Sequence, residues 1–441
     1  MGKDITEDML RRMEEEAIYE MLHYHEKSGK QKIKDTVKRA AGRYVAPKDL
    51  IFWPTAMIAN CLTEWEMGGV FLNDLLLERV SPVGEKAFSV GEKALSAVKD
   101  YFDRWIDAGM PLFYIDDVLA GVSLIDLYAA TGEGKYKIGA DKMAEYLFRM
   151  EKEAADEEGS IPYRPAQKNG YVFADGVGMT GSFLIKYGVS FGDLHSVQLG
   201  MRQMHNMFLF GMDEKTGLPY HGFQCGSKVK YGIVGWGRAV GWLIMGLARS
   251  MDCLKRYLTS EGEKKKRDGI LFDVCQSGYE ECSRAYRQLF RAVKPYQKGN
   301  GAFAWQLGAM EGPEDSSATA MIAYAVLMWM RQEGGDSDNN SSKNNSDSDN
   351  NSSNNSNNGN DNSNNKISSN SCEGLDKRTS DWEDAKDLVD RAAKYLEGCE
   401  KDGKIYRCLA ECMGFAEYPQ VYGAYPWSLG PGLGVLRKKG V

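Results

Sequence analysis

The sequence predicts a mainly α-helical protein, and three observations support this prediction. Apolar residues recur every three or four positions over many segments, which is the spacing of one buried face of a helix. The strict alternation typical of half-buried strands is scarce, and the connections are rich in helix-breaking glycines. The helical pattern covers residues 8–25, 95–108, 116–130, 136–150, 179–187, 194–210, 236–258, 279–293, 316–332 and 382–396.

In chain order, the first of these segments is a charged amphipathic helix, and the following ones have clearer apolar stripes. Val98, Tyr101, Phe102 and Trp105 form such a stripe in the second segment. The next two segments repeat the spacing, mainly with aliphatic residues, and glycine-containing turns such as 130–134 separate the segments. Each segment therefore has one face to bury against a neighbour.

About a dozen helices of this kind can form a solenoid, a bundle, or a closed ring of helical hairpins. No clear motif repeats at a fixed spacing, which disfavours the solenoid. Several loops are long, aromatic-rich and non-repetitive, and such loops would line a cleft if they gathered at one end of a ring. These loops cover residues 163–178, 217–236, 295–315 and 414–431.

The charge balance disfavours some partners. The 441 residues include 55 Lys and Arg against 62 Asp and Glu, which gives a net charge of −7. Because no basic excess is available to neutralise phosphates, we expect no nucleic-acid partner. No stretch approaches 18 uninterrupted apolar residues, so we expect no membrane span. The start of the chain is charged throughout and has no apolar secretory core as it stands.

The nine cysteines include no CxxC pair. Cys408 and Cys412 lie four positions apart, without a second pair or a nearby His to complete a zinc site. Free thiols are typical of reducing compartments. We therefore expect a cytoplasmic protein without a disulfide framework.

One segment differs from the rest in composition. Residues 336–371 contain 15 Asn and 12 Ser, with Ile367 as the only aliphatic residue. Such a segment cannot bury enough apolar surface to offset its ordering entropy, so it is expected to be disordered. It is either a tether between domains or an insertion in a surface loop, and we favour the insertion because exposed loops accept extra length at small cost. The residues after it are too few for an independent domain, so we expect one domain over residues 1–441.

Asp175 directly precedes a predicted helix, in the run Phe173-Ala-Asp-Gly-Val-Gly-Met179. The simplest interpretation is an N-cap, because a capping carboxylate accepts bonds from the free backbone N–H groups of the first turn. The alternative is a general acid, since Phe173 and Met179 supply an apolar setting that can raise the pKa of a carboxyl group.

A second acidic site and a histidine are further candidates. Asp116 and Asp117 open another predicted helix, and we expect one to cap it while the other projects towards the loop end. His221 lies in a loop beside Tyr220, and it is one of only five His in the chain. No HExxH motif or comparable cluster indicates a metal site.

A cation and two indoles open a helix in the run Gly235-Trp-Gly-Arg-Ala-Val-Gly-Trp242. Arg238 can bind a carboxylate through two hydrogen bonds, while Trp236 and Trp242 can stack on a sugar ring. The glycines of the run allow a ligand to approach the backbone closely. The alternative is a helix start with an Arg–aromatic packing contact.

The order and spacing of these pieces resemble the unsaturated glucuronyl and rhamnogalacturonyl hydrolases, glycoside hydrolase families 88 and 105. The resemblance covers most of residues 114–325. Its carriers are Ile115-Asp-Asp-Val118, Tyr128-Ala-Ala-Thr-Gly-Glu-Gly-Lys-Tyr136, Ala174-Asp-Gly176 with Met179, Thr216-Gly-Leu-Pro-Tyr-His221, Trp236-Gly-Arg-Ala-Val-Gly-Trp242 and Ser316-Ser-Ala-Thr-Ala-Met321.

This resemblance implies an (α/α)6 barrel with its active site at one end, and no metal or organic cofactor. The implied substrate is a short oligosaccharide that ends in a uronate with a C4=C5 double bond. Hydration of that vinyl ether gives an unstable hemiketal, which opens and releases the aglycone. Asp175 matches the family's catalytic carboxylate, and Asp116 matches a second Asp that assists it. His221 and Arg238 match substrate-contacting positions, and Trp242 matches a stacking position.

The chain departs from the family pattern before the catalytic loop. Relatives often have an aromatic-His pair where this chain has Ile161-Pro-Tyr-Arg164, so Arg164 either contacts extra negative charge or marks a changed specificity. Two enzyme alternatives keep the barrel: a lyase, or an inverting glycosidase in which Asp116 and Asp175 are far enough apart to admit water. A third alternative is a non-catalytic glycan-binding protein, since fold does not determine function. Further predicted substrate-binding residues are Met179, Arg164, Tyr220 and Trp236.

Overall fold

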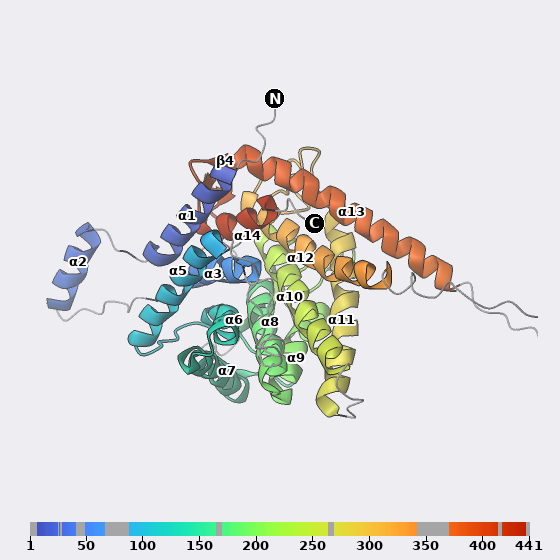
Figure 1. Cartoon of the computed structure of the whole chain (residues 1–441), viewed down its shortest axis with the longest axis horizontal. Helices are drawn as coiled ribbons and strands as arrows, with labels where there is room; N and C mark the ends of the chain where they lie inside the picture. The colour runs from blue at the N-terminus through green and yellow to red at the C-terminus, as the bar shows by residue number, and fades with distance from the viewer. Residues whose placement is uncertain are drawn as a thin grey trace, which may run out of the picture.

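A closed ring of alternating inner and outer helices forms the body of the molecule. Figure 1 shows these helices from the side. The computed structural model describes residues 7–24, 26, 29–40, 49–66, 88–164, 170–262, 269–341, 370–412 and 417–437. Within these residues each inner helix packs against the next, and the last one closes the ring against the first. The inner helices are α3 (Trp53–Glu66), α6 (Gly121–Thr131), α8 (Ala174–Phe191), α10 (Gly237–Gly262), α12 (Ser316–Ser341) and α14 (Pro426–Leu436).

An outer helix covers each inner helix, and the chain alternates between the two layers. This arrangement is an (α/α)6 barrel, so the predicted fold is confirmed. Helix α2 (Gly29–Ala40) stands apart from the ring at the left of Figure 1. The outer helices are α1 (Glu7–His23), α5 (Phe88–Asp107), α7 (Gly134–Ala154), α9 (Leu194–Phe210), α11 (Ile270–Val293) and α13 (Asn370–Cys399).

The apolar pattern of each helix explains its layer. Every residue of α14 is buried, and α8 is buried on nearly all sides. In α5, by contrast, the predicted stripe of Val98, Tyr101, Phe102 and Trp105 is buried while the opposite face is exposed. A helix that is apolar all round needs protein on every side, whereas an amphipathic helix is stable with one face in water.

Two inner helices touch backbone to backbone where glycines face each other. A Cβ atom on Gly178 of α8 would overlap the carbonyl group of Trp242 in α10, and one on Gly246 would overlap Gly178. Only glycine allows this approach. The crossing brings the start of α8, with Asp175, beside the start of α10.

Short strands form between the long loops, where local alternation did not predict them. β1 (Tyr171–Phe173), β2 (Tyr220–Gln224) and β3 (Lys230–Val234) make an antiparallel sheet in that order. Phe173 lies opposite Gly222, where a side chain would overlap the carbonyl oxygen of Val172. The remaining short elements are β4 (Glu400–Lys401), β5 (Lys404–Ile405), β6 (Cys408–Leu409), β7 (Tyr422–Gly423) and the 3-10 helices η1 (Ile115–Ala120) and η2 (Lys294–Tyr296).

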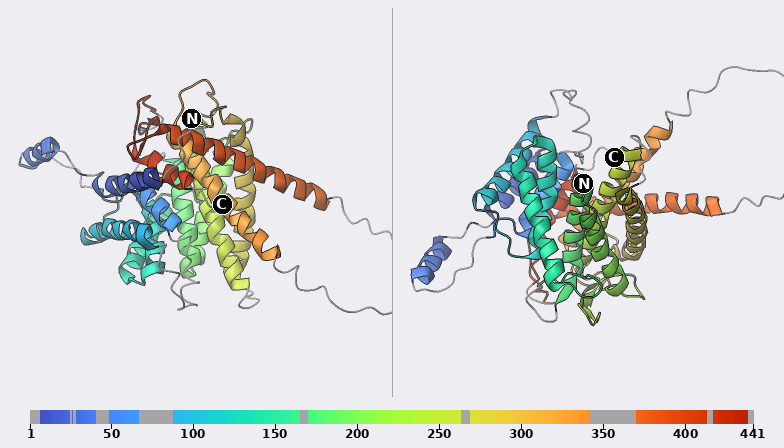
Figure 2. Two further views of the ribbon diagram at one scale, coloured as in Figure 1. Left: turned by 45° about the horizontal axis from the view of Figure 1, so that its top comes forward. Right: turned by 90° about the horizontal axis from the view of Figure 1, so that it is seen from below.

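The Asn- and Ser-rich segment falls between α12 and α13. Helix α12 continues to Ser341, and α13 begins at Asn370. Residues 342–369, which make up most of the predicted disordered segment, lie outside the described residues. Figure 2 shows α13 lying across α12, so the chain after the segment adds helices to the ring.

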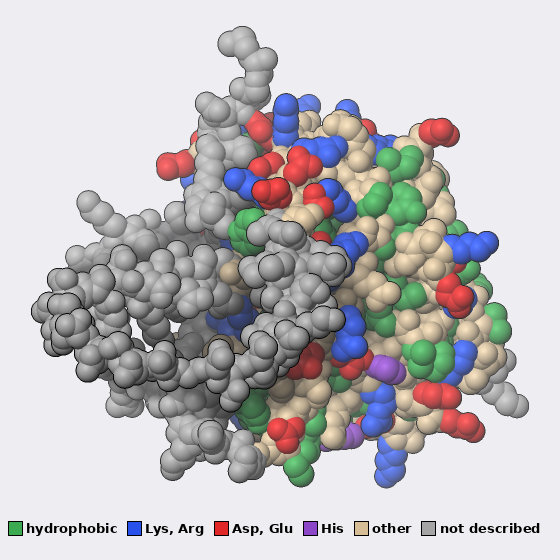
Figure 3. Space-filling view, turned by 90° about the vertical axis from the view of Figure 1, so that its right-hand side faces the viewer, with side chains coloured by type: hydrophobic (Ala, Val, Ile, Leu, Met, Phe, Trp, Pro, Cys, Tyr) green, Lys and Arg blue, Asp and Glu red, His purple; other side chains and the backbone are tan. Residues whose placement is uncertain are grey.

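The outer surface has both signs of charge. Figure 3 shows acidic and basic side chains interspersed with hydrophobic ones on the face seen from the right of Figure 1. Among the described residues, no helix is long and apolar enough to cross a membrane. Eight of the nine cysteines are free thiols: Cys61, Cys225, Cys253, Cys275, Cys282, Cys399, Cys408 and Cys412.

Candidate active site

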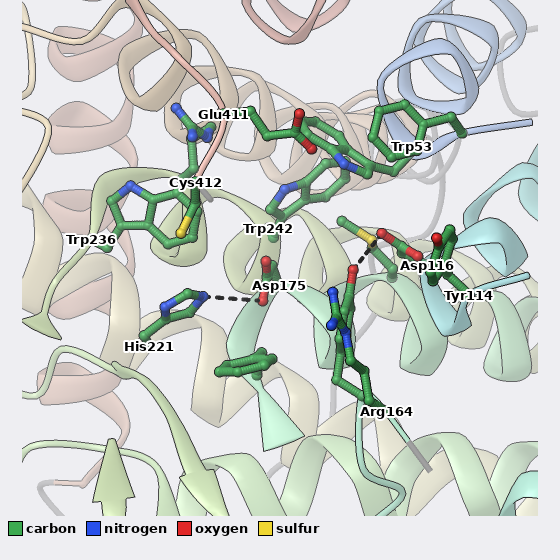
Figure 4. Close-up of a pocket in the computed structure, with 15 residues that line it drawn as sticks. Trp53, Tyr114, Asp116, Arg164, Asp175, His221, Trp236, Trp242, Glu411 and Cys412 are labelled. Carbon is green, nitrogen blue, oxygen red and sulfur yellow. Dashed lines mark hydrogen bonds and ion pairs between the residues drawn. The ribbon is translucent and has the colours of Figure 1, made fainter. Parts of the chain in front are cut away.

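The starts of several inner helices meet at one end of the ring and enclose a cavity of about 270 Å³ (Figure 4). Trp53 is the first residue of α3, Asp116 lies just before α6, and Asp175 and Arg238 are the second residues of α8 and α10. The volume is close to the lower limit of about 300 Å³ for small-molecule sites. The lining residues are Phe52, Trp53, Tyr114, Asp116, Tyr163, Arg164, Phe173, Asp175, Met179, His221, Trp236, Arg238, Trp242, Glu411 and Cys412.

Asp175 is not the N-cap of its helix. The cap position belongs to Phe173, and the structure gives it no side-chain capping bond. The Oδ1 atom of Asp175 is buried without a hydrogen-bond partner and lies 3.9 Å from Nε2 of His221. Figure 4 shows this carboxyl group pointing into the cavity. The geometry therefore favours the second interpretation, in which Asp175 is available to a ligand.

Asp116 and Asp117 have different roles, but neither is the N-cap that the sequence predicts, because Tyr114 holds that position. Oδ2 of Asp117 accepts hydrogen bonds from the backbone N–H groups of Phe113 and Tyr114 at 2.7 and 3.0 Å, which satisfies the start of η1. Asp116 instead lines the cavity, where its Oδ2 accepts a 2.6 Å hydrogen bond from the hydroxyl group of Tyr163. Its Oδ1 is buried without a partner.

Burial determines the charge state of Asp116. Loss of water raises the pKa of its carboxyl to about 7, although the Tyr163 hydrogen bond lowers it. The nearby charge of Asp175 acts in the same direction as burial. Asp116 therefore exchanges a proton near neutral pH, which is a property of general acid–base groups.

His221 is fixed by aromatic rings on β1 and at the start of α10. Its ring centroid lies 4.6 Å from that of Phe173 and 4.7 Å from that of Trp236. Nδ1 lies 2.9 Å from the hydroxyl oxygen of Tyr418, and Nε2 faces Asp175. Burial lowers the pKa of His221, so the imidazole is neutral near pH 7.

Arg238 lines the cavity, but it also makes a contact that the sequence did not predict. Its guanidinium donates to the carbonyl oxygens of Leu409 and Ala410 at 3.0 and 2.8 Å. It lies 3.9 Å from Oδ2 of Asp315 and 4.8 Å above the Trp236 ring. The group that was expected to bind a substrate carboxylate thus also holds the C-terminal loop against α10, because the barrel brings both to the same end.

The other predicted residues are divided between the cavity wall and the surface. Trp236, Trp242, Met179 and Arg164 all line the cavity. Tyr220 does not: its ring lies below the Lys230 ammonium group, at 5.7 Å. Adjacent residues of a strand point to opposite faces, so a strand that turns His221 inward turns Tyr220 away.

Sequence reasoning missed several lining residues. Trp53 meets Trp242 edge to face at 5.9 Å, and no sequence pattern marked it. Tyr163 was present only as part of the departure from the family pattern. Glu411 and Cys412 belong to the C-terminal loop, and burial raises the pKa of Glu411. In the described part of the chain, no group of three or more His, Cys, Asp or Glu side chains is placed to hold a metal ion.

The closed helical ring, with two carboxyl groups beside indole rings, defines the chain as an (α/α)6-barrel protein with a site suited to a carbohydrate. Residues 64–342, more than half of the chain, match the model of Glycosyl Hydrolase Family 88, and the chain belongs to this family.

Individual relatives are more distant. An unsaturated rhamnogalacturonyl hydrolase, YesR, of Bacillus subtilis (strain 168) is 27% identical over 169 residues, which is 37% of this chain and 48% of the relative. The match therefore spans about half the length of that protein.

Two solved structures share the fold. A possible member of the GH105 family from Salmonella enterica serovar Paratyphi A superposes with a TM-score of 0.65 at 13% identity, covering 98% of this chain and 93% of the other. An unsaturated glucuronyl hydrolase from Bacillus sp. GL1 superposes with a TM-score of 0.55 at 15% identity, with 97% of each chain covered.

Proposed function

We propose that the protein hydrolyses short oligosaccharides whose non-reducing end is a 4,5-unsaturated uronate, the type of end that a polysaccharide lyase leaves. Family membership and the relative that carries the name unsaturated rhamnogalacturonyl hydrolase support this proposal. The observation that carries it is the cavity in which the unpartnered Oδ1 of Asp175 faces Nε2 of His221 at 3.9 Å.

In the proposed reaction, Asp175 donates a proton to C4 of the vinyl ether, and positive charge develops on C5 and the ring oxygen. Water adds to C5 and returns a proton to Asp175, so the carboxyl group is regenerated. The hemiketal then opens to a C5 ketone, which leaves a hemiacetal at C1. Its collapse breaks the bond between C1 and the aglycone oxygen. The overall change consumes one water and releases two sugars.

The other lining residues have supporting roles in this proposal. Asp116, whose pKa is about 7, can gain or lose its own proton when Asp175 changes its protonation state. Trp242 and Trp53 offer apolar faces to the sugar, together with Met179. Arg164, whose side chain is exposed at the cavity wall, meets the substrate carboxylate.

Arg238 has a different role here: it holds the C-terminal loop that carries Glu411 and Cys412 at the cavity. We also propose one catalytic domain over residues 1–441, with residues 336–371 as an insertion, since α13 and α14 both pack into the ring. A cytoplasmic location is supported by the free thiols. No nucleic acid or membrane partner is proposed.

The test is to incubate the protein with unsaturated disaccharides produced by pectin lyases and by glycosaminoglycan lyases. Loss of the ultraviolet absorbance of the double bond reports turnover. We expect loss of absorbance with at least one of these substrates, and no release of sugar, followed by chromatography, from their saturated counterparts. Cleavage of the saturated compounds alone would instead support a conventional inverting glycosidase, and new absorbance on intact polymer would support a lyase. Binding without turnover of any compound would support a glycan-binding protein.

A further inference from the structure

Tyr418 lies behind His221, on the side away from Asp175. Its hydroxyl oxygen is 2.9 Å from Nδ1 of His221, whereas Nε2 of the same ring is 3.9 Å from Oδ1 of Asp175. Tyr418 comes from the C-terminal loop, 197 positions away in the sequence. Because the imidazole is neutral, only one of its two nitrogens holds a proton, and the partner of Nδ1 decides which.

The surroundings of Tyr418 determine the direction of this hydrogen bond. Burial raises the pKa of the Tyr418 phenol, whereas the backbone N–H of Ile233, directed at the phenol oxygen, acts on that pKa in the opposite direction. With a donor on that side of the oxygen, the hydroxyl proton can turn towards Nδ1 of His221, which lies 2.9 Å away and can accept it. In this arrangement Tyr418 donates, Nδ1 accepts, and the proton of the neutral imidazole is on Nε2.

The backbone of β3 holds this arrangement in place. Gly232 has a φ of +79°, and a Cβ atom there would lie 2.6 Å from Cβ of His221 and 3.4 Å from the hydroxyl oxygen of Tyr418. Glycine alone gives this conformation without strain and without a clash. The neighbouring Ile233 N–H therefore reaches the phenol oxygen, while the rings of Phe173 and Trp236 set the plane of the imidazole.

We infer that Tyr418 is a positioning residue that fixes His221 in its Nε2–H form, so that a proton donor faces Asp175 across the cavity. The inference rests on the proposed function for the roles of Asp175 and His221. Nε2–H can then stabilise the carboxylate that Asp175 becomes after it gives up its proton. In the other tautomer, a lone pair would face that carboxylate and oppose its formation. Nε2 of His221 and Oδ1 of Asp175 are 3.9 Å apart, which is too far for a hydrogen bond, and we expect this distance to shorten when a substrate binds.

The tautomer can be measured without any substrate. The chain has five His, so a protein labelled with ¹⁵N at histidine gives few imidazole signals, and His221→Gln identifies the one that belongs to His221. We expect Nε2 of His221 to resonate as a protonated nitrogen and Nδ1 as an unprotonated one. In Tyr418→Phe, which removes only the hydroxyl group, we expect the two signals to move towards a mixture of tautomers.

Activity gives the second measurement. With an unsaturated disaccharide that the protein turns over, Tyr418→Phe is expected to lower kcat about 10-fold, the equivalent of one lost directional hydrogen bond, with KM changed less than about twofold. The matched control is Tyr422→Phe in the same loop, whose hydroxyl group binds Gln420. It should leave both the His221 signals and kcat unchanged, and thermal unfolding checks that both variants fold.

The outcomes separate the inference from the proposed function. A wild-type His221 protonated on Nδ1, or a Tyr418→Phe spectrum identical to that of the wild type, would overturn the inference whether or not any sugar is hydrolysed. An altered tautomer with unchanged kcat would also overturn it, because the proton on Nε2 would then not matter to the reaction. Absence of turnover by the wild type would refute the proposed function alone, and the spectrum would still decide the tautomer.

Discussion

The hydroxyl group of Tyr163 donates a 2.6 Å hydrogen bond to Oδ2 of Asp116, and these two residues come from different parts of the barrel. Asp116 lies in η1, just before the inner helix α6, while Tyr163 lies in the loop before β1. The phenol ring rests over Gly176, where a Cβ atom would lie 3.2 Å from it, directly after Asp175 in the chain. One side chain thus links the two carboxyl groups of the site.

Tyr163→Phe should move the pH profile of the enzyme. The Tyr163 hydrogen bond lowers the pKa of Asp116, which burial raises to about 7, so its removal raises that pKa further. We expect the limb of the kcat/KM profile that reports Asp116 to shift by roughly 1 pH unit towards higher pH, the equivalent of one hydrogen bond. The measurement is kcat/KM on an unsaturated disaccharide between pH 5 and pH 9. An unshifted profile would mean that Asp116 does not titrate in the reaction.

Asp175→Asn should abolish turnover while binding persists. The amide keeps the shape of the carboxyl group but cannot transfer a proton to C4, so kcat is expected to fall by about 10²–10⁴-fold. Calorimetric titration with the same disaccharide should give a dissociation constant within about threefold of the KM-derived value for the wild type. A variant with a near-normal rate would refute the assignment of Asp175 as the acid.

Asp116→Asn should change how stability depends on pH. Burial raises the folded-state pKa of Asp116 from an ordinary value of 3.8 to about 7. The stability from this protonated carboxyl is fully present below pH 4 and is lost as the pH rises through 7. The asparagine does not titrate. The free energy of unfolding of the variant, relative to that of the wild type, should therefore increase by about 4 kcal/mol between pH 4 and pH 7.5. Urea unfolding at these two pH values measures the change.

Asp156→Asn is the contrasting control. Burial raises the pKa of Asp156, but the hydrogen bonds from Lys228, Ser160 and Gly226, together with the charge of Lys228, outweigh it and the folded-state pKa is lowered. Stability from this group is present above the unfolded-state pKa and is lost only as the pH falls through the lower, folded-state value. Its replacement should therefore lower the free energy of unfolding by nearly the same amount at pH 4 and at pH 7.5. Equal slopes for the wild type and Asp116→Asn would contradict the prediction.

Arg238→Met should destabilise the protein. The guanidinium is 2% exposed and donates to the carbonyl oxygens of Leu409 and Ala410, with Asp315 nearby. Its removal takes a donor from both carbonyl oxygens, although the indole N–H of Trp427 still donates to that of Leu409, and it leaves the buried carboxylate of Asp315 without its cation, which is expected to cost about 3–5 kcal/mol. Arg11→Met, which removes an exposed ion pair on α1, should lower the stability far less. Equal shifts of the thermal midpoint in both variants would show that Arg238 does not hold the loop.

Gly178→Ala tests the contact between the two inner helices. A methyl group there would overlap the carbonyl group of Trp242, so the helices must separate, at a cost of about 1–3 kcal/mol. The separation should also lower kcat, since Asp175 and Trp242 are placed by this crossing. Gly134→Ala at the start of α7 is the matched control, because nothing lies within 4 Å of the new methyl group. It should leave stability unchanged or increase it. An equally mild effect of both changes would argue against tight packing at Gly178.

The helical layers could be predicted from the sequence because their cause is local. The spacing of Val98, Tyr101, Phe102 and Trp105 identifies one buried face without reference to any other part of the chain. Spacing did not decide between a ring, a bundle and a solenoid, and the resemblance to a family supplied the (α/α)6 barrel. The short strands were missed, since β1 and β2 pair residues about 50 positions apart, such as Val172 with Phe223.

The sequence by itself identified the polar residues that could have a function beyond capping a helix or facing solvent. Asp116, Asp175 and His221 were candidates from their positions at helix starts and in loops, and all three line the cavity. Only the tertiary structure decided what each of them contacts. Tyr163 binds Asp116, Tyr418 binds His221, and Arg238 binds the C-terminal loop, through contacts that span 47, 197 and 171 positions. The physical reason is that the inner helices place their starts at one end of the ring, so proximity depends on the closure of the barrel and not on distance along the chain.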